Sequence, residues 1–282
     1  MFLHLIFFGA LIGIANILPG MSGGTMAVIL NIYDRLIDTI SNWRSDLMGS
    51  IRFLLPIAIG AGLAILLTSQ GISYLLETQY AKVNIFFIGI IVGSLPMIFK
   101  EAVKDKFSAV NIVATVWAFW CMVMMARFSD IENSAVVITT LSTGVFFNLL
   151  FCSAIAAVCM IIPGISGSFI MLLLGMYGTI VTAIKDLNIL LLMPIGLGIL
   201  LGILGGAKVI HSLLKQYKSV MYSAILGLVV GSIYTMCGQI LKSGELTISF
   251  GAIVAYIVVF AIGCGMTLVF DSPKLKEYFN KK

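Results

Sequence analysis

Residues 17–24 read ILPGMSGG, and residues 161–168 repeat this pattern as IIPGISGS. Both stretches contain the sequence Pro-Gly-x-Ser-Gly inside an otherwise apolar segment, and the spacing from Pro19 to Pro163 is 144 residues. Two copies of an unusual turn in one chain indicate an internal repeat, and repeats decide the architecture of a fold.

Matches outside the turns support the duplication. The spacing of 144 residues also relates Tyr33 to Tyr177, and a spacing of 138 residues relates Pro56 to Pro194. Apolar sequences often match by chance at Leu, Ile and Val, whereas Pro, Gly, Ser and Tyr in the same order are hard to obtain by chance. The predicted repeats are residues 1–133 and 134–282.

The composition predicts a membrane protein. The chain has 282 residues, of which 60% are hydrophobic and 10% are charged, and its mean hydropathy is +1.12. Soluble domains contain about 25% charged residues, and the apolar residues here form blocks long enough to cross a bilayer. The net charge of +5 is explained by cationic loops facing the cytoplasm and does not call for nucleic acid. The five cysteines and two histidines have no spacing typical of a metal site.

We expect an all-α polytopic protein in which each repeat has a helix pair broken at the turn and then three transmembrane helices. In the first repeat the pair covers residues 1–40 and the spans cover 53–76, 83–99 and 110–126. In the second repeat the pair covers residues 140–184, the spans cover 190–209, 220–241 and 248–270, and a cytoplasmic tail follows.

The helix after the first turn is expected to continue to about Ile40. Residues 21–33 make roughly 20 Å of helix, which is short of the hydrocarbon core of about 30 Å. A re-entrant hairpin therefore fits the first repeat better. Residues 166–184 are long enough to span, so both arrangements stay open.

The loop charges predict orientation. The motif pair returns to its starting side, and three spans follow it in each repeat. Because three is an odd number of crossings, the second repeat is inverted relative to the first. On that scheme 13 of the 17 Lys and Arg residues lie on one face, and the other face has Lys82, Arg127, Lys185 and Lys242. This bias makes that face cytoplasmic, places both termini inside and favours the inverted repeats found in many secondary transporters.

The Pro-Gly-x-Ser-Gly turn has a chemical interpretation. Proline breaks the incoming helix, glycine permits a tight reversal, and the next helix then begins with unpaired N–H groups that favour an anion. Irregular backbone survives inside a membrane only where it lines a cavity or packs against protein. Two such turns at a repeat interface predict an anion site near mid-membrane, while close helix packing by small residues is the alternative.

The charge of a phosphate ligand exceeds what two helix ends supply. Each end contributes about half a charge, whereas a phosphate monoester carries about −1.5 to −2 near neutral pH. A cation, a co-transported ion or a proton must supply the rest. Arg35 is the candidate nearest in sequence, with a role as a cytoplasmic-face anchor as the alternative.

Four strings together resemble the polyprenyl-phosphate transporter family. They are residues 15–25 (ANILPGMSGGT), 32–36 (IYDRL), 160–169 (MIIPGISGSF) and 174–177 (LGMY). The resemblance covers essentially the whole chain. It implies return of undecaprenyl phosphate from the outer to the cytoplasmic leaflet of a bacterial cytoplasmic membrane, for synthesis of cell-envelope polymers.

The resemblance also implies a phosphate site built from both turns. The first copy supplies Asn16, Pro19, Gly20, Ser22, Gly23, Gly24 and Thr25, and the second supplies Pro163, Gly164, Ser166, Gly167 and Ser168. The second copy has Met160 at the position of Asn16, so that polar role exists once.

Two other functions compete with lipid transport. A transporter or channel for a small anion would use the same helix ends. A membrane-embedded lipid phosphatase would need a nucleophile with a partner, and Ser22 and Ser166 have no His or Asp close by in sequence. We therefore expect a transporter with no cofactor, with coupling to H⁺ or Na⁺, the exact lipid and the oligomeric state left open.

Overall fold

The computed structural model describes residues 2–17, 21–104, 107–128 and 137–270. These residues form helices and connecting segments, with no strand among them. The helices are α1 (Phe2–Ile17), α2 (Gly23–Ile29), α3 (Tyr33–Ser41), α4 (Leu47–Ala102), α5 (Ala109–Phe128), α6 (Thr143–Ile161), α7 (Gly167–Leu173), α8 (Tyr177–Lys185), α9 (Ile189–Gln216), α10 (Lys218–Ser243) and α11 (Phe250–Phe270).

Within the described residues, six helices are long and apolar enough to cross a membrane: α4, α5, α6, α9, α10 and α11. The number rises to seven if the bent pair α7 and α8 is one span. Helix α4 has 56 residues, or about 84 Å, which is far more than one crossing needs. The prediction of an all-α polytopic membrane protein is confirmed.

The structure joins two of the predicted spans. Residues 53–76 and 83–99 lie in the two arms of α4, which meet at Gln79, where φ is −140° and ψ is 37°. In place of the expected loop, two helices meet directly at this kink.

The helix after each turn is shorter than expected. It does not continue to Ile40, because α2 ends at Ile29 and α3 begins after a break. At this break Asn31 has a φ of 57°, and at the matching break Gly175 has a φ of 70°. Asn and Gly tolerate this left-handed conformation better than other residues. In both repeats the next N–H then bonds five residues back, Ile32 to the Ala27 carbonyl and Met176 to the Met171 carbonyl, as in a Schellman cap.

The two repeats use the same packing contacts. Helix α1 lies along the first arm of α4, and α6 lies along α9. A Cβ on Gly60 would collide with the carbonyl oxygen of Ile6, and one on Gly198 would collide with that of Leu150. These two contacts occupy equivalent positions of the repeats. Small residues thus let the helix backbones approach closely.

The last helices of the repeats are exchanged. Helix α5 packs along α10, and α11 packs along the second arm of α4. Gly227 faces the backbone of Thr115, and at the equivalent position Gly89 faces the backbone of Phe260. Each repeat therefore contributes a helix to the other half of the molecule.

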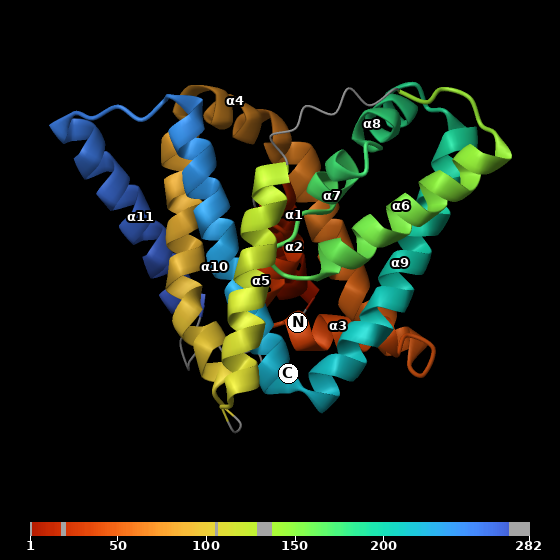
Figure 1. The fold of residues 1–282 in the computed structure, drawn as a ribbon, viewed down its shortest axis with the longest axis horizontal. Coiled ribbons are helices and arrows are strands. Elements are labelled where there is room, and N and C mark those ends of the chain that lie inside the picture. The colour runs from red at the N-terminus through yellow and green to blue at the C-terminus, as the bar shows by residue number, and fades with distance from the viewer. Residues whose placement is uncertain (1, 18–20, 105–106, 129–136, 271–282) are drawn as a thin grey trace.

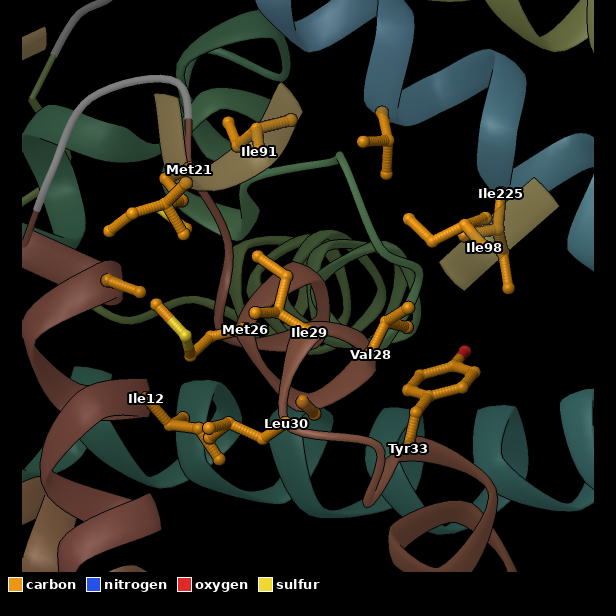
Figure 2. Close-up of a cluster of buried hydrophobic side chains, with 14 of the residues drawn as sticks. Ile12, Met21, Met26, Val28, Ile29, Leu30, Tyr33, Ile91, Ile98 and Ile225 are labelled. Carbon is orange, nitrogen blue, oxygen red and sulfur yellow. The ribbon is translucent and has the colours of Figure 1, made fainter. Parts of the chain in front are cut away.

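Helix α2 forms the centre of the largest hydrophobic cluster, and all seven of its residues are buried. Figure 2 shows the surrounding side chains, which include Ile12 of α1, Ile91 and Ile98 of α4, and Ile225 of α10. Helix α2 is thus buried between elements of both repeats.

The short helices α3 and α8 lie at opposite ends of the molecule (Figure 1). In this view the helices converge towards the end that holds α3 and diverge towards the end that holds α8. We call these the α3 end and the α8 end.

Candidate functional site

The described residues of the first turn find hydrogen-bond partners within their own repeat. The Ser22 hydroxyl accepts a hydrogen bond from the Thr25 N–H at 3.2 Å and lies 3.0 Å from the Thr25 hydroxyl. The Gly23 N–H donates to the Asn16 side-chain oxygen at 2.9 Å. Pro19 and Gly20 lie outside the described residues. The start of α2 therefore has internal partners for these groups.

The structure brings the two turns into contact. The Gly164 N–H donates to the Thr25 hydroxyl at 2.8 Å and to the Ser22 hydroxyl at 3.3 Å. A Cβ on Gly24 would lie 2.8 Å from the Ile161 carbonyl oxygen, so the backbones meet directly. Hydroxyls of the first turn thus hold the backbone of the second.

The second turn lacks the side-chain cap bond that the first turn has, and its hydroxyls are accessible. Pro163 and Gly164 are buried, but Ser166 makes no side-chain cap bond to α7. Its hydroxyl instead lies 2.8 Å from that of Ser168. Gly167 follows Ser166 at the start of α7 and approaches the Met160 side chain. This turn presents two hydroxyls on an accessible face.

A cavity of about 700 Å³ lies beside this second turn. Helices α5, α7, α8 and α10 supply its walls. Its lining residues are Met122, Ala126, Arg127, Gly164, Ser166, Ser168, Phe169, Leu172, Tyr177, Tyr234, Thr235, Gly238, Gln239 and Lys242. The lining combines hydroxyls and two cationic side chains with apolar and aromatic surface, so it suits an amphiphilic anion.

The candidate phosphate-binding residues divide into two groups. Gly164, Ser166 and Ser168 line the cavity. The first-turn residues that the structure describes are not among its lining, although the hydroxyls of Ser22 and Thr25 accept the Gly164 N–H. Their assignment to a phosphate site stays a prediction.

Arg35 does not reach this cavity. Its guanidinium lies 4.5 Å from the centre of the Phe53 ring, and its side chain is exposed. The cations that line the cavity are Arg127 and Lys242, which sequence reasoning did not select. Their signal was present, because both belong to the few cations assigned to the less basic face.

Polar contacts hold α3 against its neighbours at the α3 end. Lys218 of α10 lies 2.7 Å from Asp34 and 3.4 Å from Glu101 of α4. The Tyr222 hydroxyl donates to Asp34 at 2.7 Å. His211 of α9 lies 3.0 Å from Asp38. Four helices are thus joined at this end, on the other side of the molecule from α8.

Comparisons with known proteins agree with this architecture. The family described as undecaprenyl phosphate translocase-like (VCA0040-like) matches residues 12–249. A polyprenyl-phosphate transporter of Vibrio cholerae serotype O1 is 29% identical over 260 residues, covering 84% of this chain and 80% of the relative. A polyprenyl-phosphate transporter of Staphylococcus aureus is 29% identical over 236 residues, covering 81% and 83%. No solved structure matches the chain. The family match extends over both turns and most of the helices, and the chain therefore belongs to the undecaprenyl phosphate translocase-like family.

Proposed function

We propose that this protein moves a polyprenyl phosphate between the leaflets of a bacterial cytoplasmic membrane. The observation that carries the proposal is the cavity beside the second turn, where hydroxyls and cations adjoin apolar side chains. A phosphate head needs polar donors, and an isoprenoid tail needs apolar surface. The names of the two relatives, both polyprenyl-phosphate transporters, support the same substrate.

The architecture supports inverted repeats with a re-entrant first motif. The equivalent helices α3 and α8 lie at opposite ends of the molecule (Figure 1), as an inverted duplication requires. Helix α2 has seven residues, or about 10 Å, and ends inside the hydrophobic cluster. The first motif therefore enters the membrane and turns back, and we assign the same form to the second.

Transport proceeds by alternating access around the paired turns. We assign this structure to a state in which the α3 end is closed and the α8 end receives the ligand, because α8 and the last turns of α5 and α10 line the cavity. The excess of cations assigned to the α3 side makes that side cytoplasmic and places both termini there. The direction we propose is the one that the family resemblance implies, from the outer to the cytoplasmic leaflet, which returns undecaprenyl phosphate for the synthesis of cell-envelope polymers. A proton or Na⁺ is the expected source of energy.

Proteoliposomes test the proposal. The full chain is reconstituted with a polyprenyl phosphate carrying a fluorophore that dithionite bleaches from the outside. We expect bleaching to extend beyond the outer-leaflet fraction in the presence of protein, and not in protein-free liposomes. Bleaching that stays at the outer-leaflet fraction would overturn lipid transport. Uptake of inorganic phosphate in the same liposomes would instead favour the small-anion transporter.

A cell experiment tests the direction. In bacteria without redundant carriers, depletion of the protein should increase the undecaprenyl phosphate exposed at the cell surface. An unchanged surface level contradicts inward transport.

A further inference from the structure

We propose that Arg127 and Lys242 supply the positive charge that neutralises the phosphate in the cavity, and that they form a head-group site with Ser166 and Ser168. This inference rests on the proposed function, and it assigns the countercharge to Arg127 and Lys242 in place of Arg35. The four side chains come from α5, α10 and the start of α7, and all of them line the same cavity.

The pairing of α5 with α10 places the two cations at one end. The helices run parallel, since Gly227 faces Thr115 and Gly231, further along, faces Met122. Both therefore end on the same side of the molecule. Arg127 lies in the last turn of α5, and Lys242 lies in the last turn of α10.

The spacing of the lining residues directs both helices towards the cavity. On α5 the cavity is lined by Met122 and Ala126, four residues apart, and then Arg127. On α10 it is lined by positions 234–235, 238–239 and 242. Residues three or four apart lie on one face of a helix, so Lys242 continues the face of positions 238 and 239. Arg127 directly follows Ala126 and lines the same cavity from the end of α5.

The two side chains are suited to a phosphate monoester, which carries about −1.5 to −2 near neutral pH. The described lining contains no Asp or Glu. Arginine offers a planar fork for two phosphate oxygens, and lysine offers a point charge. The Ser166 and Ser168 hydroxyls, 2.8 Å apart, add donors on the side of the second turn.

The apolar lining gives the site its preference for a lipid. Met122, Phe169 and Leu172 line the same cavity as the cations. An isoprene unit next to the phosphate would cover these side chains, whereas free phosphate would leave them in water. Removal of apolar surface from water favours the ligand that carries a tail.

Lys185 provides a matched control. It ends α8, is exposed and does not line the cavity. Lys185→Gln therefore removes one positive charge at the α8 end without touching the proposed site.

The test measures binding of farnesyl phosphate to the purified full chain in detergent, with farnesol and inorganic phosphate as comparison ligands. We expect Arg127→Gln and Lys242→Gln each to weaken farnesyl phosphate binding about tenfold, and the double variant about a hundredfold. Arg127→Lys, which keeps the charge, should lose less than Arg127→Gln. Lys185→Gln should bind as the wild type does, and farnesol binding should not change in any variant.

The outcomes separate this inference from the proposed function. If the double variant binds farnesyl phosphate as tightly as the wild type does, the proposed role of the cations is wrong. Lipid transport itself is not affected by that result. If the wild type neither binds farnesyl phosphate nor moves the tagged lipid in liposomes, the proposed function itself fails. Inorganic phosphate that binds as tightly as farnesyl phosphate overturns the lipid preference of the site.

Discussion

The two Pro-Gly-x-Ser-Gly turns have nearly the same sequence and very different surroundings. At the first turn, Ser22 and Thr25 are buried and bonded to each other, and α2 is enclosed on all sides. At the second turn, Ser166 and Ser168 line a cavity. With the inverted repeats and alternating access proposed above, the two turns face opposite sides of the membrane and differ in any one state of the transporter. We infer that the difference between the turns is one of conformational state.

The neighbouring short helices show the same contrast. Helix α3 carries Asp34 and Asp38, which pair with Lys218 and His211 and hold α3 against α9 and α10. At the equivalent positions α8 has Gly178 and Thr182, which cannot form ion pairs. Charged contacts therefore hold α3 in place, and α8 lacks them at the equivalent positions. The predictions below test this contrast, from the largest expected effect to the smallest.

The largest effect is expected from Gly164→Ala, at the point where the turns meet. Gly164 has a φ of 92°, and a Cβ there would lie 2.9 Å from the Leu228 side chain and 3.1 Å from its backbone. Left-handed strain of about 1–2 kcal/mol adds to overpacking of about 1–3 kcal/mol. We expect a lower thermal unfolding temperature in detergent and loss of lipid movement in liposomes.

Gly205→Ala is the matched control, since a Cβ at Gly205 of α9 meets nothing within 4 Å. It should unfold at the wild-type temperature or slightly above, because alanine favours a helix. Equal destabilisation by both substitutions would contradict the close contact at Gly164.

The hydroxyls of the two turns should have different roles. Thr25→Val removes the nearer acceptor of the Gly164 N–H, and an unsatisfied buried group costs about 1–3 kcal/mol of stability. The farther Ser22 hydroxyl should recover part of this loss. We expect Thr25→Val to lower the unfolding temperature.

Ser168→Ala is the comparison on the open turn. Its hydroxyl is exposed and bonds Ser166, so its loss should weaken farnesyl phosphate binding and leave the unfolding temperature unchanged. The contrast between the turns fails if Ser168→Ala destabilises the protein as much as Thr25→Val.

Sequence patterns predicted the helical membrane fold because bilayer spans require long apolar blocks. They missed the break after α2, although Asn31 and Gly175 occupy matching positions and both favour a left-handed cap. That signal is local and was available in the sequence. The sequence does not show that Arg127 and Lys242 line one cavity, because this depends on α5 of one repeat packing against α10 of the other. A single sequence gives the spans but not which spans exchange between repeats.

A smaller effect is expected from opening the α3 end. Asp34 binds both Lys218 and Tyr222, so Asp34→Asn weakens two contacts that hold α3. Partly exposed ion pairs contribute about 1 kcal/mol or less, which corresponds to a shift of a few-fold in the population of the open state. In a cysteine-free background, Met21→Cys, at a position 2% exposed, should react with a thiol reagent a few-fold faster when Asp34→Asn is added.

Lys218→Gln tests the same contact from α10, where Lys218 reaches both Asp34 and Glu101. It should also speed the labelling of Met21→Cys, and Asp34→Asn added to it should speed the labelling little further. Labelling that neither single substitution changes would show that the ion pair does not close this end.

The smallest effect is expected from His211→Gln. His211 contacts Asp38 at 3.0 Å, and the Asp38 side chain is 59% exposed, so water screens this contact more than the one at Asp34. The substitution should change labelling of Met21→Cys less than Asp34→Asn does. An effect as large as that of Asp34→Asn would place the main closing contact at α9 and not at α10.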